Sequence, residues 1–164
     1  MIAVAMNDAP EEFAPMLNAQ RDGWNTAMEL RYVSATVDEV TAEWTVGPQH
    51  LQAYGIVHGG VHAGVIETLA SVGAALNARA RGQSIVGLEN HTSFIRAVRE
   101  GTLRATARPI TRGRRTQVWE AAVTDPDGRI VATGRVRLLA LEPEAAVAGE
   151  TVAVKVGSPG PRAP

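Results

Sequence analysis

Hydrophobic and polar residues alternate along residues 24–32 and again along 40–46, which is the pattern of strands with one face in a core. Gly47 and Pro48 end the second stretch. After Gly82 the sequence predicts more strands, the last two of which are joined by the turn sequence Asp125-Pro126-Asp127-Gly128. The expected ranges of these later strands are 84–96, 101–111, 115–124 and 129–141.

A long helix is expected at residues 59–80, because apolar side chains recur there at intervals of three and four. Its opposite side is also apolar or small, and a helix that is apolar nearly all round is buried on most sides. Each glycine in it should lower helix stability by about 1 kcal/mol relative to alanine, so close packing against a sheet would explain their presence. A shorter helix is predicted near the N-terminus, from a capping Asp8 to an end at Gly23.

The order of these elements predicts an α+β fold, in which an antiparallel sheet of five to six strands wraps round one long central helix. The 164 residues suffice for one domain of this kind. We expect a helical lead-in at residues 1–23, the main domain at 24–141 and a mostly disordered tail at 142–164. Within the tail, residues 152–156 could add a short strand.

Composition excludes several classes of protein. The formal net charge of −1 argues against a nucleic-acid binder. The chain has no cysteine, which excludes disulfides, thiolate catalysis and cysteine metal sites. We see no signal peptide and no apolar run near the roughly 20 residues that span a bilayer. A soluble, cytoplasmic protein with no membrane partner is therefore expected.

Charge is distributed unevenly along the chain. Residues 1–50 carry eight acidic and two basic side chains, whereas residues 96–115 carry seven arginines and a single acid, Glu100. A local basic patch in a neutral protein suits a small polyanion better than a nucleic-acid duplex. The alternative is that these arginines lie on solvated strand faces and contribute little.

Two features of the expected long helix are candidates for chemistry. Gly59 and Gly60 stand at its start, where unpaired backbone amides and the helix dipole can stabilise an anion, although many helices begin with glycine for steric reasons. Glu67 has apolar neighbours, and a carboxylate there is costly unless it is paired or needed for base or nucleophile chemistry. The alternative places Glu67 on a narrow solvated stripe. Ser71, four residues on, could hold a water near Glu67 or bond back to a helix carbonyl.

The spacing of these two features predicts an oligomer. Gly59 and Glu67 are eight residues apart, which is about 12 Å along a straight helix. An oxyanion donor and an attacking group must both lie about 3 Å from the reacting atoms, so one chain cannot supply both. Two antiparallel copies could, and a twofold dimer is the simplest such assembly.

Other types of site find little support in the sequence. His58 and His62 are four residues apart, but the metalloprotease pattern of two histidines with an intervening glutamate is absent, so we expect no metal site. His50 and His91 add no ligand spacing to this pair. No glycine-rich phosphate loop and no nucleophile elbow are present.

The motifs together resemble the hotdog-fold thioesterases of the phenylacetate-degradation type. The likeness covers residues 24–141 and is closest to the branch with the enterobactin-pathway proofreading thioesterase and the dihydroxynaphthoyl-CoA thioesterase. The segments that carry it are Gly55-Ile56-Val57-His58-Gly59-Gly60, Glu67-Thr68-Leu69-Ala70-Ser71, Val86-Gly87-Leu88-Glu89-Asn90, Arg96-Ala97-Val98-Arg99-Glu100-Gly101 and the stretch from Gly113 to Glu120.

This resemblance implies a thioester hydrolase with assigned roles. Glu67 would attack the thioester or activate water, the Gly59 amide would stabilise the oxyanion, and Gln52 would help to hold the thioester oxygen. His58 would orient the site or assist the leaving thiolate, and Ser71 would position water. Whether Glu67 forms an anhydride or only activates water stays open.

The substrate implied is an acyl- or aroyl-coenzyme A. Some relatives have histidine where this chain has Phe94 and proline where it has Ala97, so a different, apolar or aromatic acyl group is expected. The arginine cluster would suit the phosphates of coenzyme A. Gly60, Phe94, Arg96, Arg112 and Arg114 are the expected substrate-binding residues.

No cofactor is expected, because coenzyme A is part of the substrate. The homo-oligomer would be a dimer or a dimer of dimers, that is, a homotetramer. Two other functions stay open: a hotdog domain that binds acyl-CoA as a sensor, and a hotdog dehydratase or hydratase. Glu67, Gln52 and Ser71 argue against the sensor, and the acid–base spacing of a dehydratase is not found.

Overall fold

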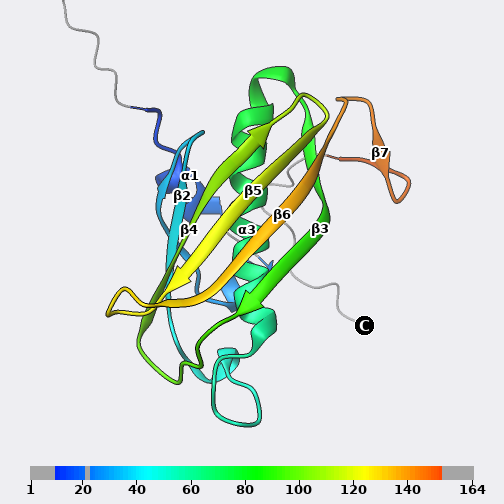
Figure 1. Ribbon diagram of the computed structural model, residues 1–164. Helices are drawn as coiled ribbons and strands as arrows, with labels where there is room; N and C mark the ends of the chain where they lie inside the picture. Colours follow the sequence, from blue (N-terminus) through cyan, green and yellow to red (C-terminus); the bar gives the residue numbers. More distant parts are fainter. Residues whose placement is uncertain (1–9, 21–22, 153–164) are drawn as a thin grey trace, which may run out of the picture.

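The computed structural model describes residues 10–20 and 23–152. A six-stranded sheet has the strand order β1-β2-β4-β5-β6-β3, and all its pairs are antiparallel. The long helix α3 lies along one face of this sheet (Figure 1). The predicted α+β architecture, with one central helix in an antiparallel sheet, is confirmed. The elements are α1 (Ala14–Gln20), α2 (Gly23–Ala27), β1 (Arg31–Ala35), β2 (Val40–Thr45), α3 (Gly59–Ala78), β3 (Ser84–Phe94), β4 (Thr102–Arg112), β5 (Thr116–Thr124), β6 (Ile130–Leu141), β7 (Ala146–Val147) and β8 (Glu150–Thr151), with short 3-10 turns at Pro48–His50 and Arg79–Arg81.

The core lies between α3 and the inner face of the sheet. Val65, Ile66 and Leu69 of α3 are fully buried there. Gly73 lies directly beneath the ring of Trp119 on β5, and a Cβ at Gly73 would come within 2.3 Å of that ring. Helix and sheet therefore approach so closely that only glycine fits at this point, as the sequence predicted.

The predicted strand at residues 24–32 was wrong in its first half. Residues Gly23–Ala27 form α2, and β1 begins only at Arg31. Trp24 packs so closely against α3 that a Cβ at Gly64 would lie 2.5 Å from its ring. The helical turn ends at Glu29, whose φ of 51° turns the chain into β1. Apolar and polar residues alternate along 24–28 because the apolar ones lie on the side of a helical turn that faces α3.

The N-terminal helix also starts later than predicted. The residue that satisfies its first amides is Glu12, whose Oε1 accepts from the N–H of Ala14 at 2.8 Å and from the N–H of Ala35 at 2.6 Å. Burial alone would raise the pKa of Glu12, but these backbone hydrogen bonds and one from Ser34 together lower it. Asp8, the predicted cap, lies outside the described residues. Glu12 thus ties α1 to β1.

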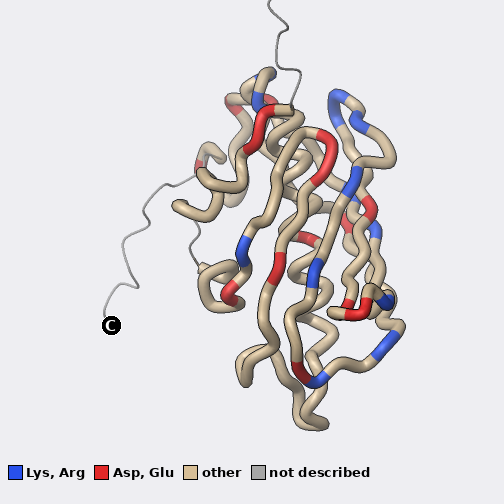
Figure 2. The backbone as a smooth tube through the Cα atoms, turned by 90° about the vertical axis from the view of Figure 1, so that its left-hand side faces the viewer, with Lys and Arg blue, Asp and Glu red and all other residues tan. Residues whose placement is uncertain are grey.

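Part of the uneven charge of the sequence is neutralised by ion pairs between β4 and the acidic residues in and just before β2. Acidic side chains in and just before β2 face arginines of β4, which is its neighbour in the sheet. Acidic segments therefore lie beside basic segments of the neighbouring strand (Figure 2). The partners are Glu43 with Arg104, Glu39 with Arg108, and Asp38 with Arg112. These three arginines lie on solvated strand faces, which is the alternative that the sequence left open.

The first part of the predicted tail is ordered. Residues Ala146–Val147 and Glu150–Thr151 pair as a small antiparallel hairpin, apart from the main sheet. Its turn places Ala148 and Gly149 at positive φ, which matches the twist of short hairpins. The strand predicted for 152–156 falls, apart from Val152, outside the described residues.

One expectation about apolar runs was wrong. The helical stretch from Gly59 to Arg81 is, by length and composition, long and apolar enough to cross a membrane. The stretch is this apolar because Val, Ala and Gly occupy nearly all sides of the helix. Its buried side packs against β2, β3, β4, β5 and β6, so it is a core helix in this fold.

The fit of Gly73 under Trp119 gives a test of the packing. Gly73→Ala should lower the free energy of unfolding by about 1–3 kcal/mol, because the added methyl overpacks the core. Helix propensity alone would raise it by about 1 kcal/mol. Urea denaturation measures the sign, and Ala75→Gly at an exposed site of the same helix is the control for propensity. A stabilised Gly73→Ala variant would contradict this packing.

Candidate active site

One backbone amide at the start of α3 has no hydrogen-bond partner among the residues that the structure describes. The Nδ1 of His58 accepts from the N–H of Gly60 at 2.8 Å, and the carbonyl of His58 accepts from the N–H of Val61 at 2.9 Å. The N–H of Gly59 makes no hydrogen bond within the described chain. Because the positive end of the helix dipole lies here, the free Gly59 amide is a donor for an anionic oxygen.

The capping bond also selects the tautomer of neutral His58. Because Nδ1 accepts a hydrogen bond, the ring proton of neutral His58 lies on Nε2, which can donate to a bound group. The backbone of His58 is fixed by a 2.8 Å bond from its N–H to the carbonyl of His50. The buried His50 ring is itself held between the N–H of Gly47 and the carbonyl of Met28. His50 is therefore a structural residue that positions His58.

Gln52 lies in a tight loop before α3. Its N–H bonds to the carbonyl of Ile56 at 2.9 Å, and its carbonyl accepts from the N–H of Gly55 at 2.8 Å. The guanidinium of Arg99 donates to the carbonyls of Tyr54 and Gly55 at 2.8 and 3.0 Å. Arg99 thus holds this loop, while the side-chain amide of Gln52 has no partner in the described chain.

A pocket of about 490 Å³ surrounds the start of α3. Six of the predicted site residues line it together: Gln52, His58, Gly59, Gly60, Phe94 and Arg96. The ring of Phe94 lies over Gly59, where a Cβ would come within 2.8 Å of it, yet 62% of Phe94 is exposed. The glycine therefore allows an aromatic ring, or a substrate in its place, to lie against the helix start.

Glu67 lies farther along α3 and is half-buried against β3. Its Oε1 accepts from the Ser71 hydroxyl at 3.3 Å, and its Oε2 accepts from the Asn90 amide at 3.2 Å. The backbone of Gly87 comes so near that a Cβ there would lie 2.5 Å from Oε1. The predicted proximity of Ser71 and Glu67 is found, as a bond to the carboxylate.

The sequence reasoning missed Asn90. Its side chain donates to Glu67 and to the carbonyl of Ala63 at 3.0 Å, so it orients the carboxylate from the neighbouring strand. Asn90 stands in a segment that carried the family resemblance. Its place in that segment was the signal that could have identified Asn90, because the local periodicity does not show that this strand lies beside Glu67.

Single-chain geometry does not bring all predicted residues together. Glu67 and Ser71 do not line the pocket at Gly59. Arg112 bonds to Asn77 near the other end of α3, about 27 Å along the helix from Gly59. Arg114 lies in the same turn as Arg112, after the end of β4. Within one chain the predicted site residues therefore fall into separate groups, one around Gly59 and one around Glu67.

His62 is a buried histidine in the pocket wall. Only 4% of it is exposed, and its ring lies 6.4 Å from the rings of both Trp44 and Phe94. Burial lowers the pKa of His62 to about 4. Its Nδ1 and the Nε1 of Trp44 are the two buried side-chain atoms without a hydrogen-bond partner among the described residues.

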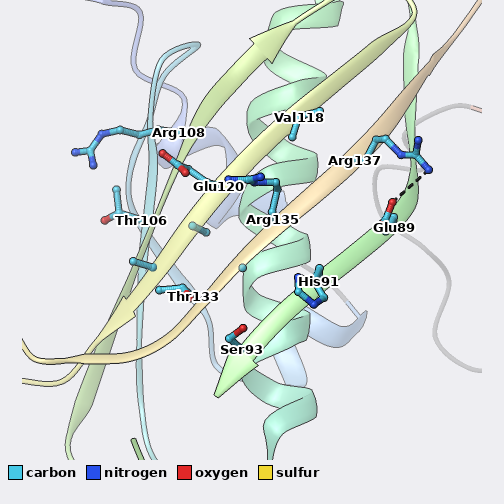
Figure 3. Close-up of a pocket in the computed structure, with 13 residues that line it drawn as sticks. Glu89, His91, Ser93, Thr106, Arg108, Val118, Glu120, Thr133, Arg135 and Arg137 are labelled. Carbon is cyan, nitrogen blue, oxygen red and sulfur yellow. Dashed lines mark ion pairs between the residues drawn. The ribbon is translucent and has the colours of Figure 1, made fainter. Parts of the chain in front are cut away.

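A second, larger hollow of about 840 Å³ lies on the outer face of the sheet (Figure 3). Glu120 and Arg135 face each other across β5 and β6, and Glu89 pairs with Arg137 at 3.2 Å. None of the predicted site residues lines it. It is a set of solvated charges, and we assign no chemistry to it.

No group of three or more metal-ligating side chains is found among residues 10–20 and 23–152. The polar groups around Gly59 and Glu67 are amides, a carboxylate, a hydroxyl and imidazoles.

Comparison with known proteins supplies the family. The sequence model of the Thioesterase superfamily matches residues 54–132. The Mycobacterium tuberculosis protein Rv1847, named as an esterase, is 40% identical over 84% of this chain and 98% of its own. Its solved structure superposes with a TM-score of 0.71 at 39% identity, covering 73% of this chain and 96% of that one.

Two further relatives carry names that state an activity. The proofreading thioesterase EntH of Cronobacter turicensis is 36% identical over 65% of this chain and 77% of its own. The 1,4-dihydroxy-2-naphthoyl-CoA hydrolase of Escherichia coli is 31% identical over 73% of this chain and 88% of its own.

The low pKa of His62 predicts a pH dependence of stability. Between pH 6.5 and pH 4 the unfolded chain binds a proton at His62 that the folded chain does not, so stability is lost as pH falls through this window. The loss from pH 7 to pH 5 should be about 2 kcal/mol greater for wild type than for His62→Leu. Urea unfolding at the two pH values measures it, with exposed His91→Leu as control. Equal losses in wild type and His62→Leu would contradict the burial of a neutral His62.

Proposed function

Because the chain belongs to the thioesterase superfamily, we propose that it hydrolyses an acyl- or aroyl-coenzyme A at a site shared by two copies of the chain. The family makes it a hydrolase acting on thioesters. The coenzyme A substrate and the residue roles are the proposal. The coenzyme A part of the proposal is supported by the name of the Escherichia coli relative, a 1,4-dihydroxy-2-naphthoyl-CoA hydrolase.

The observation that carries the proposal is the unpaired Gly59 amide in a pocket. Attack on a thioester converts its carbonyl oxygen to an oxyanion, and a fixed N–H at that point stabilises the transition state by about 3–4 kcal/mol. The Gly60 amide is already bonded to His58, so Gly59 supplies this hydrogen bond. Gln52, with a free side-chain amide in the same pocket, is the second donor.

Glu67 acts as nucleophile or as general base. As base, it takes a proton from water while the water oxygen bonds to the thioester carbon; as nucleophile, it forms an anhydride that water then hydrolyses. In either route the carbon–sulfur bond breaks and its electron pair leaves with the thiolate of coenzyme A. In this proposal His58 Nε2–H donates to that sulfur. Ser71 and Asn90 hold the carboxylate in position for attack.

The distance between the half-sites supports a dimer. Gly59 and Glu67 lie about 12 Å apart along α3, too far for one thioester. Strand β3 is an edge of the sheet, Glu67 packs against it, and its Leu88 is 49% exposed. A second copy that pairs along this edge would place its α3 antiparallel to the α3 of the first copy. Each Glu67 would then lie toward Gly59 of the other chain. A dimer of dimers would contain the same unit twice.

Coenzyme A carries negatively charged phosphates, for which arginines are suitable partners. Arg96 lines the pocket and makes no ion pair among the described residues, so it suits a phosphate. Arg114 is exposed at the far end of α3 and would serve a ligand bound to the other copy. Arg112 is paired with Asp38, which weakens its predicted role. No further cofactor is required, and we place the activity in the cytoplasm.

Glu67→Gln should fold normally and lower kcat by about 10²–10⁴-fold, because the amide can neither attack nor take a proton. Thiol release from benzoyl-, phenylacetyl-, short-chain and long-chain acyl-CoAs measures this. Glu89→Gln, the same change on the outer face, is the matched control and should retain activity. Turnover by Glu67→Gln at wild-type kcat would remove Glu67 from the mechanism. Tight binding of acyl-CoA with no turnover by wild type would favour a sensor.

Gly59→Pro deletes the free amide with little cost to the fold. Proline is favoured at the first helical position, and His58 already has the extended conformation (φ −66°, ψ 135°) that precedes proline. The expected loss is about 10²–10³-fold in kcat. The ring of Phe94 must move aside, so Phe94→Ala with and without Gly59→Pro is the control pair. Unchanged kcat in the proline variant would exclude the Gly59 amide as oxyanion donor.

A further inference from the structure

We propose that Arg99 is a positioning residue that holds the side-chain amide of Gln52 in place for oxyanion binding. This inference rests on the proposed hydrolysis of a thioester, in which Gln52 is the second donor, and it names the group that orients this donor. In the sequence, Arg99 was one of seven arginines in a basic stretch. Its contacts in the fold give it a different use.

Arg99 binds backbone carbonyls, whereas three other arginines of the same stretch pair with carboxylates. One guanidinium nitrogen, Nη1, donates to the carbonyl oxygens of Tyr54 and Gly55 at 2.8 and 3.0 Å. Hydrogen bonds from a charged donor are roughly twice as strong as those between neutral groups. We call these two bonds the Arg99 clamp.

The clamped turn is otherwise exposed. It begins at Gln52, whose carbonyl accepts from the N–H of Gly55 at 2.8 Å, and 80% of Tyr54 is exposed. In Figure 1 this loop projects beyond the start of α3. Within the described chain, the hydrogen bonds that residues 53–55 accept from outside the loop come from Arg99 alone. The orientation of the turn, and of Gln52 in it, therefore depends on the Arg99 clamp.

Gly55 has the backbone conformation that the clamp needs. Its φ of 67° lies in the left-handed region, and the carbonyls on both sides of its Cα–N bond reach the same nitrogen of Arg99. A Cβ at this position would come within 3.2 Å of that nitrogen. Glycine avoids both the backbone strain and the close contact.

The clamp also joins the two walls of the pocket. One wall comes from the loop 52–58 and the start of α3, and the other comes from residues 94–97 at the end of β3. Arg99 follows the second wall and bonds to the first. Beside the clamp, the N–H of Val57 donates to the carbonyl of Val98 at 2.8 Å. Because this backbone bond holds the end of the loop next to α3, Arg99 is needed for the part that carries Gln52.

The position of Gln52 matters because an oxyanion donor acts only at short range, about 3 Å from the developing charge. Its side-chain amide has no partner in the described chain, so the backbone of the turn determines where the amide lies. A misplacement of about 1 Å can lower a rate by about 10²-fold. Loss of the clamp should therefore lower kcat and kcat/KM equally and leave KM unchanged, which is the pattern of an interaction made only in the transition state.

A double-mutant cycle between Arg99 and Gln52 tests this role. The assay is thiol release from the coenzyme A thioester that wild type hydrolyses fastest. Arg99→Met should lower kcat by about 10–100-fold in the wild-type background. In the Gln52→Ala background the same change should lower kcat by less than about twofold, because no amide is left to position.

The matched control is Arg31→Met. It removes another exposed arginine, which pairs with Glu43 at 2.9 Å on the opposite edge strand β1, and it should leave kcat unchanged. If Arg99→Met does not fold, Arg99→Gln takes its place in the cycle, since glutamine keeps a polar but shorter side chain at this surface.

Three results would overturn the role of Arg99 and leave the hydrolase proposal standing. They are an unchanged kcat in Arg99→Met, an equal loss with and without Gln52→Ala, and a Gln52→Ala variant with the kcat of wild type. The second would show that Arg99 only stabilises the fold, and the third that Gln52 is not a donor. A wild type that hydrolyses no coenzyme A thioester contradicts the proposed function, and the role of Arg99 with it.

Discussion

The close contact between α3 and the inner face of the sheet is the constraint on which the site depends. Trp119 lies over Gly73, Trp24 over Gly64, and the carboxylate of Glu67 lies against the backbone of Gly87. These contacts fix the axial position and rotation of the helix. Because the helix is fixed, the amide of Gly59 points into a pocket and Glu67 lies against the edge strand β3. The two groups of one chain therefore stay apart.

The first turn of α3 assigns a separate task to each residue. His58 uses its ring nitrogen to occupy the Gly60 amide, so a single N–H is left for an oxyanion. His62, in the next turn, lies in the pocket wall, where burial lowers its pKa to about 4. His50, behind both, holds the backbone of His58. Three histidines close in sequence thus differ in role because their burial and partners differ.

Strand positions could be predicted from the sequence where alternation reflects a one-sided core, as along β4, β5 and β6. The strand predicted at residues 24–28 was wrong because Trp24 packs on Gly64, and this contact between distant segments outweighs the local alternation. Gly59 and Glu67 were predictable as candidates, since a glycine at a helix start and an acid among apolar neighbours are unusual in any helix. Asn90 was not, because only the order of the strands brings it to Glu67. The ion pairs of Arg104, Arg108 and Arg112 were unpredictable for the same reason: their acidic partners lie more than sixty residues away, in and just before β2.

The central claim is that each active site takes its amide from one chain and its carboxylate from another. Co-expression of Glu67→Gln and Gly59→Pro copies with two different affinity tags, followed by purification through both tags, tests it directly. The mixed dimer contains one site with both native groups, so its kcat should approach about half that of wild type although each variant alone is nearly inactive. A mixed dimer as inactive as its parents would contradict a shared site.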